Sequence, residues 1–513
     1  MECGMNVNRR MLRLAPLAAA LMTAGIAQAT SLSVPMPAAW KPGDGRAVAA
    51  LFAALDARSR PHSTAHAAAT LPVTSCADDG SSGTLRSIVT LAGDGDTVDA
   101  SALTCTAIAL TQGAIAVYQD DLAIAGPGAS ALAIDGANAD RVFAHYGHGT
   151  LTLQGVTVRN GFTRVTGYHV TGGACIISNG YVSIERSAVT GCVAEGEGAY
   201  GGGITARGLG IYSSTLSGNI ARGSHANTFT AAYGGGAMAY RGYATIIGSM
   251  ISGNRATHTL TDTHGSYCTG GGIFSDGGGY LYGSTLSGNY SYGTGGGLAT
   301  HGPFDIANST FANNAARFKT GGGVFARVFY PMRIDNSTIA SNTSGRPGAG
   351  IYLAGIANAL TLRSSIVATN LTAGAHDDIA AMTPFTISGS NNLVIAAAAN
   401  VILPAGTIHA DPMLAPLANN GGPTRTMALQ IGSSAVDAGS NPLRLASDQR
   451  GAGFARVLGA AADIGAFEGT LAPAPVLPVP LLPGWLAVLL TGLLGSGAWR
   501  ALRKRRASAI FVR

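Results

Sequence analysis

The chain between about residues 151 and 371 repeats one pattern of apolar and polar positions. Each unit contains a glycine cluster, a short stretch in which apolar and polar residues alternate, and a closing asparagine. Residues 244–252, 280–287 and 332–340 show the alternation clearly. Alternation with a period of two is typical of a β-strand that buries one face, so the pattern predicts short strands throughout this region.

Six asparagines close successive units at intervals of 25 to 35 residues: Asn219, Asn254, Asn289, Asn314, Asn342 and Asn370. The units are rich in glycine, serine, threonine and asparagine, which are unfavourable inside helices, and no Trp-Asp dipeptide of a propeller blade recurs. We therefore expect an all-β, right-handed parallel β-helix. In such a solenoid one residue type at one position of every coil forms a ladder. We expect the six asparagines to form a structural ladder that satisfies buried polar groups.

The flanks of the repeats predict two short helices. Residues 46–58 place Val48, Leu51, Phe52 and Leu55 on one helical face, within an Ala/Pro-rich leader or end cap at 30–70. A second helix at 84–91 is expected to close the open end of the solenoid, because an uncapped coil exposes backbone edges. We assign 71–150 to this amino-terminal cap and the first coils, 151–371 to the repeats, and 372–468 to the last coils and a carboxy-terminal cap.

Composition and charge narrow the function classes. The 513 residues include 73 glycines, and only 11% are charged. The formal charge of +6 comes from the ends, because residues 30–469 contain 23 of the 32 basic residues and 25 of the 26 acidic ones. Nucleic acid binding depends on concentrated positive charge, so we do not expect a nucleic acid partner.

The first 29 residues predict a secretory signal peptide. Basic residues at positions 9, 10 and 13 precede an apolar run at 14–26, and Ala27-Gln-Ala29 forms a small-residue cleavage site. The pattern implies cleavage by signal peptidase before Thr30. A twin-arginine export signal is the alternative interpretation of Arg9-Arg10.

Five cysteines remain after this cleavage, in an exported and oxidising setting where disulfides form. A bond between Cys76 and Cys105 would join the amino-terminal cap to the first coil. A bond between Cys175 and Cys192 would join neighbouring positions of one coil. Cys268 would then be left over, and we expect an inert thiol there because no Cys-x-x-Cys motif is present.

The carboxy-terminal end predicts a membrane-passing tail. A Pro-rich spacer at 469–478 leads into the apolar run 479–499, which is long enough to cross a bilayer, and basic residues follow it up to residue 506. Before any processing, the protein would contact the membrane only through this helix.

Several motifs resemble the choice-of-anchor Q family of bacterial surface proteins. They lie at 76–98, 387–393, 411–417, 419–424, 432–439, 448–451 and 463–468. The resemblance implies an exported β-helix with an interchangeable surface anchor, and it implies no agreed activity. The tail 479–513 resembles PEP-CTERM and IPTL-CTERM sorting signals, with Val479, Pro480 and Trp485 at the motif positions. This second resemblance implies an exosortase-like protease in a Gram-negative inner membrane, and delivery to the cell surface or the medium.

Two classes of function stay open. The first is a structural or adhesive surface protein that contacts extracellular polysaccharide, with Tyr280, Tyr290 and Tyr292 as a candidate aromatic platform for sugar rings. The alternative is a polysaccharide lyase or glycoside hydrolase, which would need a close acid and base. No carboxylates recur at equivalent places in adjacent units, so we assign no catalytic residue and lean against an enzyme.

The sequence implies no cofactor and no metal site. Oxygen-rich turns containing Asp437, Asp448, Asp463 and Glu468 could hold calcium, but their spacing matches no known calcium loop. We expect these carboxylates to cap backbone amides and to pair with Arg450, which would stabilise the carboxy-terminal cap.

Overall fold

The computed structural model describes residues 34–35, 45–58, 67–166, 169–224, 230–259, 267–355 and 359–469. The predicted signal peptide and the sorting tail lie outside these residues, as does all of the Pro-rich spacer except Gly469, and they stay predictions. Within the described ranges, no helix has both the length and the apolar character needed to span a membrane.

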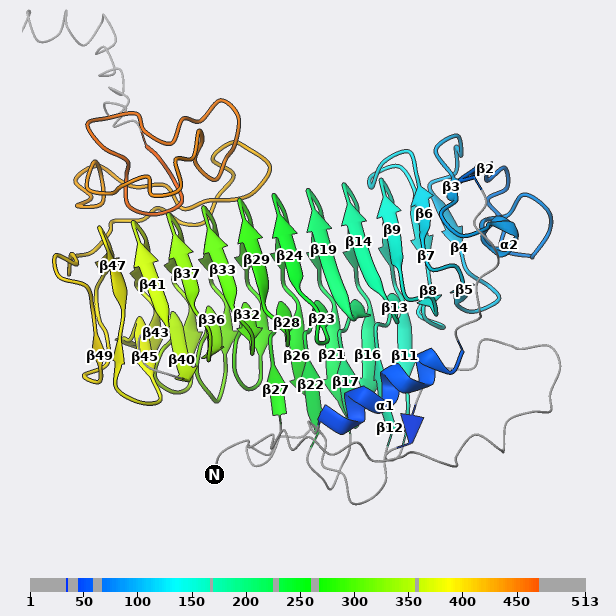
Figure 1. Cartoon of the computed structure of the whole chain (residues 1–513), viewed down its shortest axis with the longest axis horizontal. Helices are drawn as coiled ribbons and strands as arrows, with labels where there is room; N and C mark the ends of the chain where they lie inside the picture. The colour runs from blue at the N-terminus through cyan, green and yellow to red at the C-terminus, as the bar shows by residue number, and fades with distance from the viewer. Residues whose placement is uncertain are drawn as a thin grey trace, which may run out of the picture. The chain divides into compact units, whose positions relative to one another are not determined.

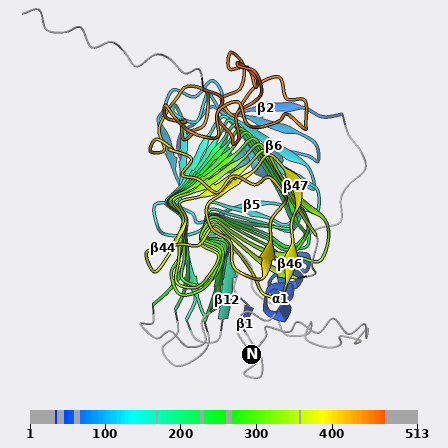
Figure 2. The same cartoon turned by 90° about the vertical axis from the view of Figure 1, so that its left-hand side faces the viewer.

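The strands form a parallel β-solenoid of about eleven coils, which confirms the all-β solenoid predicted from the repeats. Successive strands of one coil belong to different sheets, and each pairs in parallel with the equivalent strand of the next coil (Figure 1). In the end-on view of Figure 2, equivalent strands overlap along the stack. Two pairings among the named strands of the described ranges are antiparallel, β1 with β12 and β43 with β44.

The sheets are named here by their number of strands. The twelve-stranded sheet contains β2 (Thr70–Pro72), β3 (Thr97–Asp99), β6 (Leu122–Ala125), β9 (Thr150–Gln154), β14 (Tyr181–Glu185), β19 (Gly208–Tyr212), β24 (Ala244–Ile247), β29 (Gly279–Tyr282), β33 (Phe304–Ala307), β37 (Met332–Asp335), β41 (Leu360–Arg363) and β47 (Ser388–Ser390). The eleven-stranded sheet contains β4 (Ala107–Ala109), β7 (Ala133–Asp135), β10 (Thr157–Arg159), β15 (Ala188–Thr190), β20 (Thr215–Ser217), β25 (Met250–Ser252), β30 (Thr285–Ser287), β34 (Thr310–Ala312), β38 (Thr338–Ala340), β42 (Ile366–Ala368) and β48 (Leu393–Val394).

The ten-stranded sheet contains β5 (Ile115–Val117), β8 (Phe143–His145), β13 (Ile176–Ser178), β18 (Ile204–Ala206), β23 (Ala237–Ala239), β28 (Ile273–Ser275), β32 (Leu298–Thr300), β36 (Val324–Val328), β40 (Ile351–Gly355) and β45 (Ile379–Ala381). The nine-stranded sheet contains β11 (Phe162–Arg164), β16 (Val193–Gly196), β21 (Ile220–Gly223), β26 (Arg255–His258), β31 (Tyr290–Ser291), β35 (Ala315–Ala316), β39 (Thr343–Ser344), β43 (Leu371–Thr372) and β44 (Ala375–His376). Two smaller sheets contain β1 (Val34–Pro35), β12 (His169–Gly172), β17 (Gly198–Tyr200), β22 (Ala231–Tyr233) and β27 (Tyr267–Thr269), and the pair β46 (Phe385–Thr386) and β49 (Val401–Ile402).

The hydrophobic core fills the inside of the coils with aligned aliphatic side chains. In the twelve-stranded sheet Ile184, Ile211, Ile246, Leu281 and Ile306 follow one another in register, and each is at most 1% exposed. Burying one such side chain contributes roughly 1.5–3 kcal/mol. The inward half of the alternating pattern therefore drives folding, and the outward half is left for surface contacts.

The glycine clusters mark a turn where the next coil leaves no room for most side chains. The first glycine of a cluster, such as Gly234, has a positive φ of 63°. The third has a different reason for being glycine: a Cβ on Gly236 would lie 2.6 Å from the carbonyl oxygen of Gly272 and 3.0 Å from Cγ of Asn254. No real Cβ approaches backbone so closely, so the asparagine of a coil can sit inside the turn only because its glycine has no side chain.

Both predicted helices are present. Helix α1 (Gly45–Asp56) buries Leu51, Phe52 and Leu55, but it lies against the side of the solenoid rather than over its end (Figure 1). The ring of Phe52 stacks on Tyr240 with centroids 4.9 Å apart. The interpretation of this segment as an end cap is therefore wrong. The helix packs on the side of the solenoid because the aromatic outer surface of several coils offers it an apolar partner.

Helix α2 (Leu85–Leu91) begins after Thr84, whose hydroxyl accepts a hydrogen bond from the backbone N–H of Ser87, a standard N-cap. Its buried residues Leu85 and Val89 belong to the same core cluster as the interior of the coils.

Residues 411–469 contain isolated β-bridges but no named strand, and they pack on the outside of the eleven-stranded sheet. Thr285, Thr310 and Thr338 point outward from three adjacent strands, yet each is at most 1% exposed. The hydroxyl of Thr310 donates to Gln449 Oε1 (2.5 Å), and the backbone N–H of Ala466 donates to Thr338 Oγ1 (3.0 Å). This region therefore folds back along the solenoid instead of extending it.

Candidate functional site

The six predicted asparagines form one continuous ladder inside the turn after the eleven-stranded sheet. The backbone N–H and the side-chain Nδ2 of Asn254 both donate to Oδ1 of Asn289, each at 3.0 Å. Nδ2 also donates to the carbonyl oxygen of Leu216 at 2.9 Å. The same arrangement repeats along the ladder, and all six side chains are fully buried. The asparagines hold coils together and present no atom to solvent.

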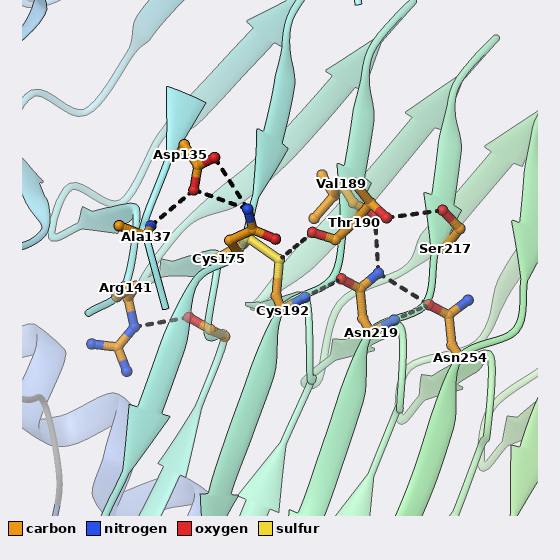
Figure 3. The surroundings of a disulfide bond; sticks show 12 residues. Asp135, Ala137, Arg141, Cys175, Val189, Thr190, Cys192, Ser217, Asn219 and Asn254 are labelled. Carbon is orange, nitrogen blue, oxygen red and sulfur yellow. Dashed lines mark hydrogen bonds between the residues drawn. A yellow bond between two sulfur atoms is a disulfide. The ribbon is translucent and has the colours of Figure 1, made fainter. Parts of the chain in front are cut away.

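The ladder ends on two residues that sequence analysis missed. At the amino-terminal side the backbone N–H of Cys192 donates to Oδ1 of Asn219 at 3.1 Å (Figure 3). At the other side the backbone N–H and the side-chain Nδ2 of Asn370 both donate to Oδ1 of Asp378, each at 2.9 Å. Neither end residue is an asparagine, so the repeated residue type did not identify them. Cys192 takes the place equivalent to Asn219 in the preceding coil, whereas Asp378 lies eight residues after Asn370, beyond the antiparallel pair β43 and β44.

A second ladder, of serines, also escaped the sequence analysis. The backbone N–H of each of the first six serines donates to the hydroxyl of the equivalent serine in the next coil, at 3.0–3.3 Å, and that of the seventh donates to Oδ1 of Asn392. Its members are Ser187, Ser214, Ser249, Ser284, Ser309, Ser337 and Ser365. From Ser214 onward these serines follow the same intervals as the ladder asparagines, a signal that could have identified the second ladder.

Both predicted disulfides are confirmed, Cys76 with Cys105 and Cys175 with Cys192. Figure 3 shows the second bond beside the start of the asparagine ladder. Two disulfides indicate an oxidising, extracellular location. Cys268 is a buried free thiol, and burial raises its pKa to about 12, which leaves it an unreactive thiol at neutral pH.

The structure divides the three candidate platform tyrosines between two sheets. Tyr280 lies in β29 of the twelve-stranded sheet, whereas Tyr290 begins β31 of the nine-stranded sheet and Tyr292 follows that strand. The chain turns between these sheets, so the side chains leave the coil on different faces. The three tyrosines therefore do not form the single platform that we predicted, and they belong to two separate surfaces.

The first surface is an aromatic row on the outside of the twelve-stranded sheet. We call Tyr181, Tyr212, Tyr280 and Tyr282 the tyrosine row. The hydroxyl oxygens of Tyr181 and Tyr212 lie 3.4 Å apart. The rings of Tyr280 and Tyr282 are parallel to within 8°, with centroids 6.3 Å apart, and Tyr280 is 38% exposed. Burial raises the pKa of Tyr280, so its hydroxyl stays protonated at neutral pH and can donate a hydrogen bond.

Two glycines provide the space for the first half of this row. Gly208 and Gly210 face outward from β19, beside Tyr181 of the preceding strand. A Cβ on Gly208 would lie 2.7 Å from the Tyr181 ring, and one on Gly210 would lie 2.5 Å from the ring of Tyr212. The rings therefore lie across the sheet surface where side chains would otherwise stand.

Charged side chains follow the tyrosine row on the same face. Asp305 is in register with Tyr280 and lies 3.7 Å from Arg333, in a largely exposed pair. Asp335 is buried and accepts two hydrogen bonds from Arg363, at 2.6 and 2.7 Å. Each carboxylate thus has an arginine partner, and the two acids do not occupy equivalent positions in their strands.

The second surface contains Tyr290 and Tyr292. They line a hollow of about 450 Å³ on the outside of the nine-stranded sheet. We call it the arginine–tyrosine hollow; its other lining residues are Ile220, Arg222, Arg255, Thr257 and His258. The guanidinium of Arg255 lies 4.8 Å from the centroid of the Tyr290 ring, and the ring of His258 contacts Tyr292 with centroids 3.8 Å apart.

An acid–base site could use a histidine, but His145 and His148 both have structural partners. His145 is buried between Ser178 Oγ (2.7 Å) and the carbonyl oxygen of Gln119 (2.9 Å), and burial lowers its pKa. His148 Nε2 lies 3.1 Å from Asp56 at the end of helix α1. His264 lies outside the described residues.

The acidic turns near the carboxy-terminal end form a buried network. Arg450 donates to both carboxylate oxygens of Asp448 and to the carbonyl oxygen of Glu468, and its guanidinium lies between the rings of Phe454 and Phe467 at 4.0 and 3.9 Å. The carboxylate of Glu468 accepts backbone N–H groups. Within the described ranges no group of three or more potential ligands is arranged to hold a metal ion. The contacts agree with the structural interpretation of these turns.

Comparison with known protein families finds no match, and neither does comparison with curated proteins. Among solved structures, pectate lyase Pel9A is similar with a TM-score of 0.40 and 13% sequence identity. The similarity covers 80% of this chain and 98% of that structure. A similarity this weak indicates no activity for this chain, and the parallel solenoid is established by its own strand pairing.

Proposed function

We propose that the protein is an exported structural or adhesive solenoid that contacts extracellular polysaccharide through the tyrosine row. The observation that carries the proposal is the set of four tyrosines gathered on one outward face. Tyrosine offers an apolar ring and a hydroxyl in one side chain, which suits a sugar ring with one apolar face and polar edges. The tyrosines lie on β14, β19 and β29, with β24 between the last two, and a row spread over several coils suits a polymer better than a single sugar.

The route to the surface is part of this proposal. The signal peptide at 1–29 and the tail at 479–513, with Val479, Pro480 and Trp485, support export and sorting by signal peptidase and an exosortase-like protease. The resemblance to the choice-of-anchor Q family supports a surface role. We also propose that the solenoid coils in the right-handed sense and that helix α2 caps its amino-terminal end.

The proposal is tested by retention of the purified full chain on insoluble cellulose, mannan and amylose. The double variant Tyr280→Ala/Tyr282→Ala should lose at least about tenfold in retention, because ring contacts of this kind contribute on the order of 1 kcal/mol each. Tyr330→Ala is the matched control, since Tyr330 is 62% exposed and lies outside the tyrosine row. Equal retention by the double variant and the wild type would exclude the row as the contact.

The enzymatic alternative is supported by one observation, the two aspartates and two arginines beside the tyrosine row. The same incubations, with calcium added, should be assayed for new reducing ends and unsaturated sugars. Cleavage by the wild type that Asp305→Asn abolishes would replace the adhesive proposal with a lyase or hydrolase. Retention without cleavage supports the adhesive role.

A further inference from the structure

The arginine–tyrosine hollow concentrates positive charge and aromatic rings on one outward face. Ile220, Arg255 and Tyr290 stand in register on three adjacent strands, and Ala221, Ala256 and Ser291 beside them are fully buried. Side chains alternate across a strand, so the first three point outward while their neighbours fill the core. The hollow is therefore built on a rigid part of the solenoid.

The charge around the hollow is unbalanced. Glu195 is 7% exposed and accepts hydrogen bonds from both Arg164 (2.8 Å) and Arg222 (3.3 Å). Arg255 in β26 and Arg317, directly after β35, are exposed on the same face. No carboxylate is among the described residues that line the hollow. One carboxylate shared by two arginines leaves positive charge available to a ligand.

The aromatic side chains limit the chemistry of that ligand. The Tyr292 ring contacts Phe318 with centroids 4.5 Å apart, and Tyr290 carries the guanidinium of Arg255 on its face. A small inorganic anion would use the arginines and leave the rings without a role. A ligand that joins negative groups to apolar ring faces would use both, and arginine pairs well with a carboxylate or a sulfate because its N–H groups form a planar fork.

We propose that the arginine–tyrosine hollow binds an acidic polysaccharide, with Arg222 and Arg255 pairing with its carboxylate or sulfate groups and Tyr290 and Tyr292 contacting its sugar rings. Nucleic acid is the weaker candidate, because it requires a continuous basic surface and residues 30–469 contain more acidic than basic residues. The two disulfides place the protein where polysaccharides are the common polyanions. This site lies on a different sheet from the tyrosine row, so either can fail without the other.

The test measures retention of the purified full chain on immobilised polygalacturonate and on chondroitin sulfate, with mannan as the neutral polymer. Arg222→Gln/Arg255→Gln should weaken retention on at least one acidic polymer by about tenfold or more, and leave mannan unaffected. The polymer that is affected tells whether carboxylate or sulfate is preferred. Arg425→Gln/Arg444→Gln removes the same charge from exposed side chains elsewhere and should change nothing.

Two single variants test the binding contacts one at a time without disturbing the fold. Arg255 has no carboxylate partner among the described residues, so Arg255→Gln leaves no charge unpaired and should weaken binding alone. Tyr290→Ala should weaken it at high salt as well as low salt, since ring contacts are not screened. Three outcomes would each overturn the proposal. The two double variants could lose retention equally, the wild type could retain neither acidic polymer, or it could retain duplex DNA more tightly than both polymers.

Discussion

Glycine has two separate roles in this chain, and they differ at the scale of single residues. Gly236 is required by space, since a Cβ there would meet the backbone of the next coil. Gly253 precedes a ladder asparagine with a φ of 64°, and nothing lies within 4 Å of where its Cβ would be. Asn313, Ser341 and Thr369 take the equivalent place in later coils with φ of 57–58°. Only the first role excludes every side chain.

These two roles predict losses of unfolding free energy of different size when the glycine is substituted. Gly236→Ala should lower the free energy of unfolding by roughly 1–3 kcal/mol or more, as overpacking against backbone does. Gly253→Asn should change it by less than about 1 kcal/mol, because asparagine tolerates a positive φ. Urea unfolding of both variants measures the difference. Similar midpoints for the two would contradict the distinction.

The asparagine ladder is predictable from the sequence because one residue type recurs at one position of every unit. The terminal residues Cys192 and Asp378 are not identified in this way. They differ in type from the asparagines, and Asp378 is brought back to Asn370 by the antiparallel turn between β43 and β44, which the repeat does not contain. A ladder can thus be predicted in its middle and only observed at its ends.

At the scale of elements, the carboxylate that ends the asparagine ladder carries a pH dependence. Asp378 is fully buried, and burial raises its pKa, with nearby His376 acting in the opposite direction. A raised pKa means that the folded state favours the protonated acid. The stabilisation is complete below the ordinary aspartate pKa and is lost as pH rises through the higher, folded value.

The prediction concerns the wild type compared with Asp378→Asn, which keeps an acceptor for Asn370 but has no charge. From about pH 4 upward the wild type should lose unfolding free energy relative to this variant. Urea unfolding at several pH values up to about 7, with both chains carrying His376→Gln, measures the difference without the histidine. A difference that stays constant with pH would show that Asp378 is not the group responsible.

At the scale of the whole described unit, residues 411–469 act as a clamp along the side of several coils. Gln449 is 3% exposed, and its amide donates to Oγ1 of Thr285 (2.9 Å) and of Thr424 (3.0 Å), while its Oε1 accepts from Thr310. One side chain from this region therefore connects two adjacent coils of the solenoid.

Loss of this side chain should release the clamp without unfolding the coils. Gln449→Ala leaves the buried hydroxyl of Thr310 without its acceptor, at a cost of about 1–3 kcal/mol, while Thr285 and Thr424 keep backbone carbonyl partners. Hydrogen–deuterium exchange should become faster across 411–469 and stay unchanged in strands β14 and β19. Gln430→Ala is the control, since Gln430 is exposed in the same region. Faster exchange in β14 and β19 as well would show one cooperative unit instead.

The solenoid, its asparagine ladder, the two candidate disulfides and the two helices could be predicted from the residues alone. Each of these depends on local alternation, on a residue type repeated in every coil, or on few candidate partners. The tertiary structure alone decided that Tyr280 separates from Tyr290 and Tyr292, that helix α1 and residues 411–469 lie along the sides, and that arginines meet tyrosines in a hollow. These depend on where each coil turns from one sheet to the next, because that turn decides which outward side chains share a face.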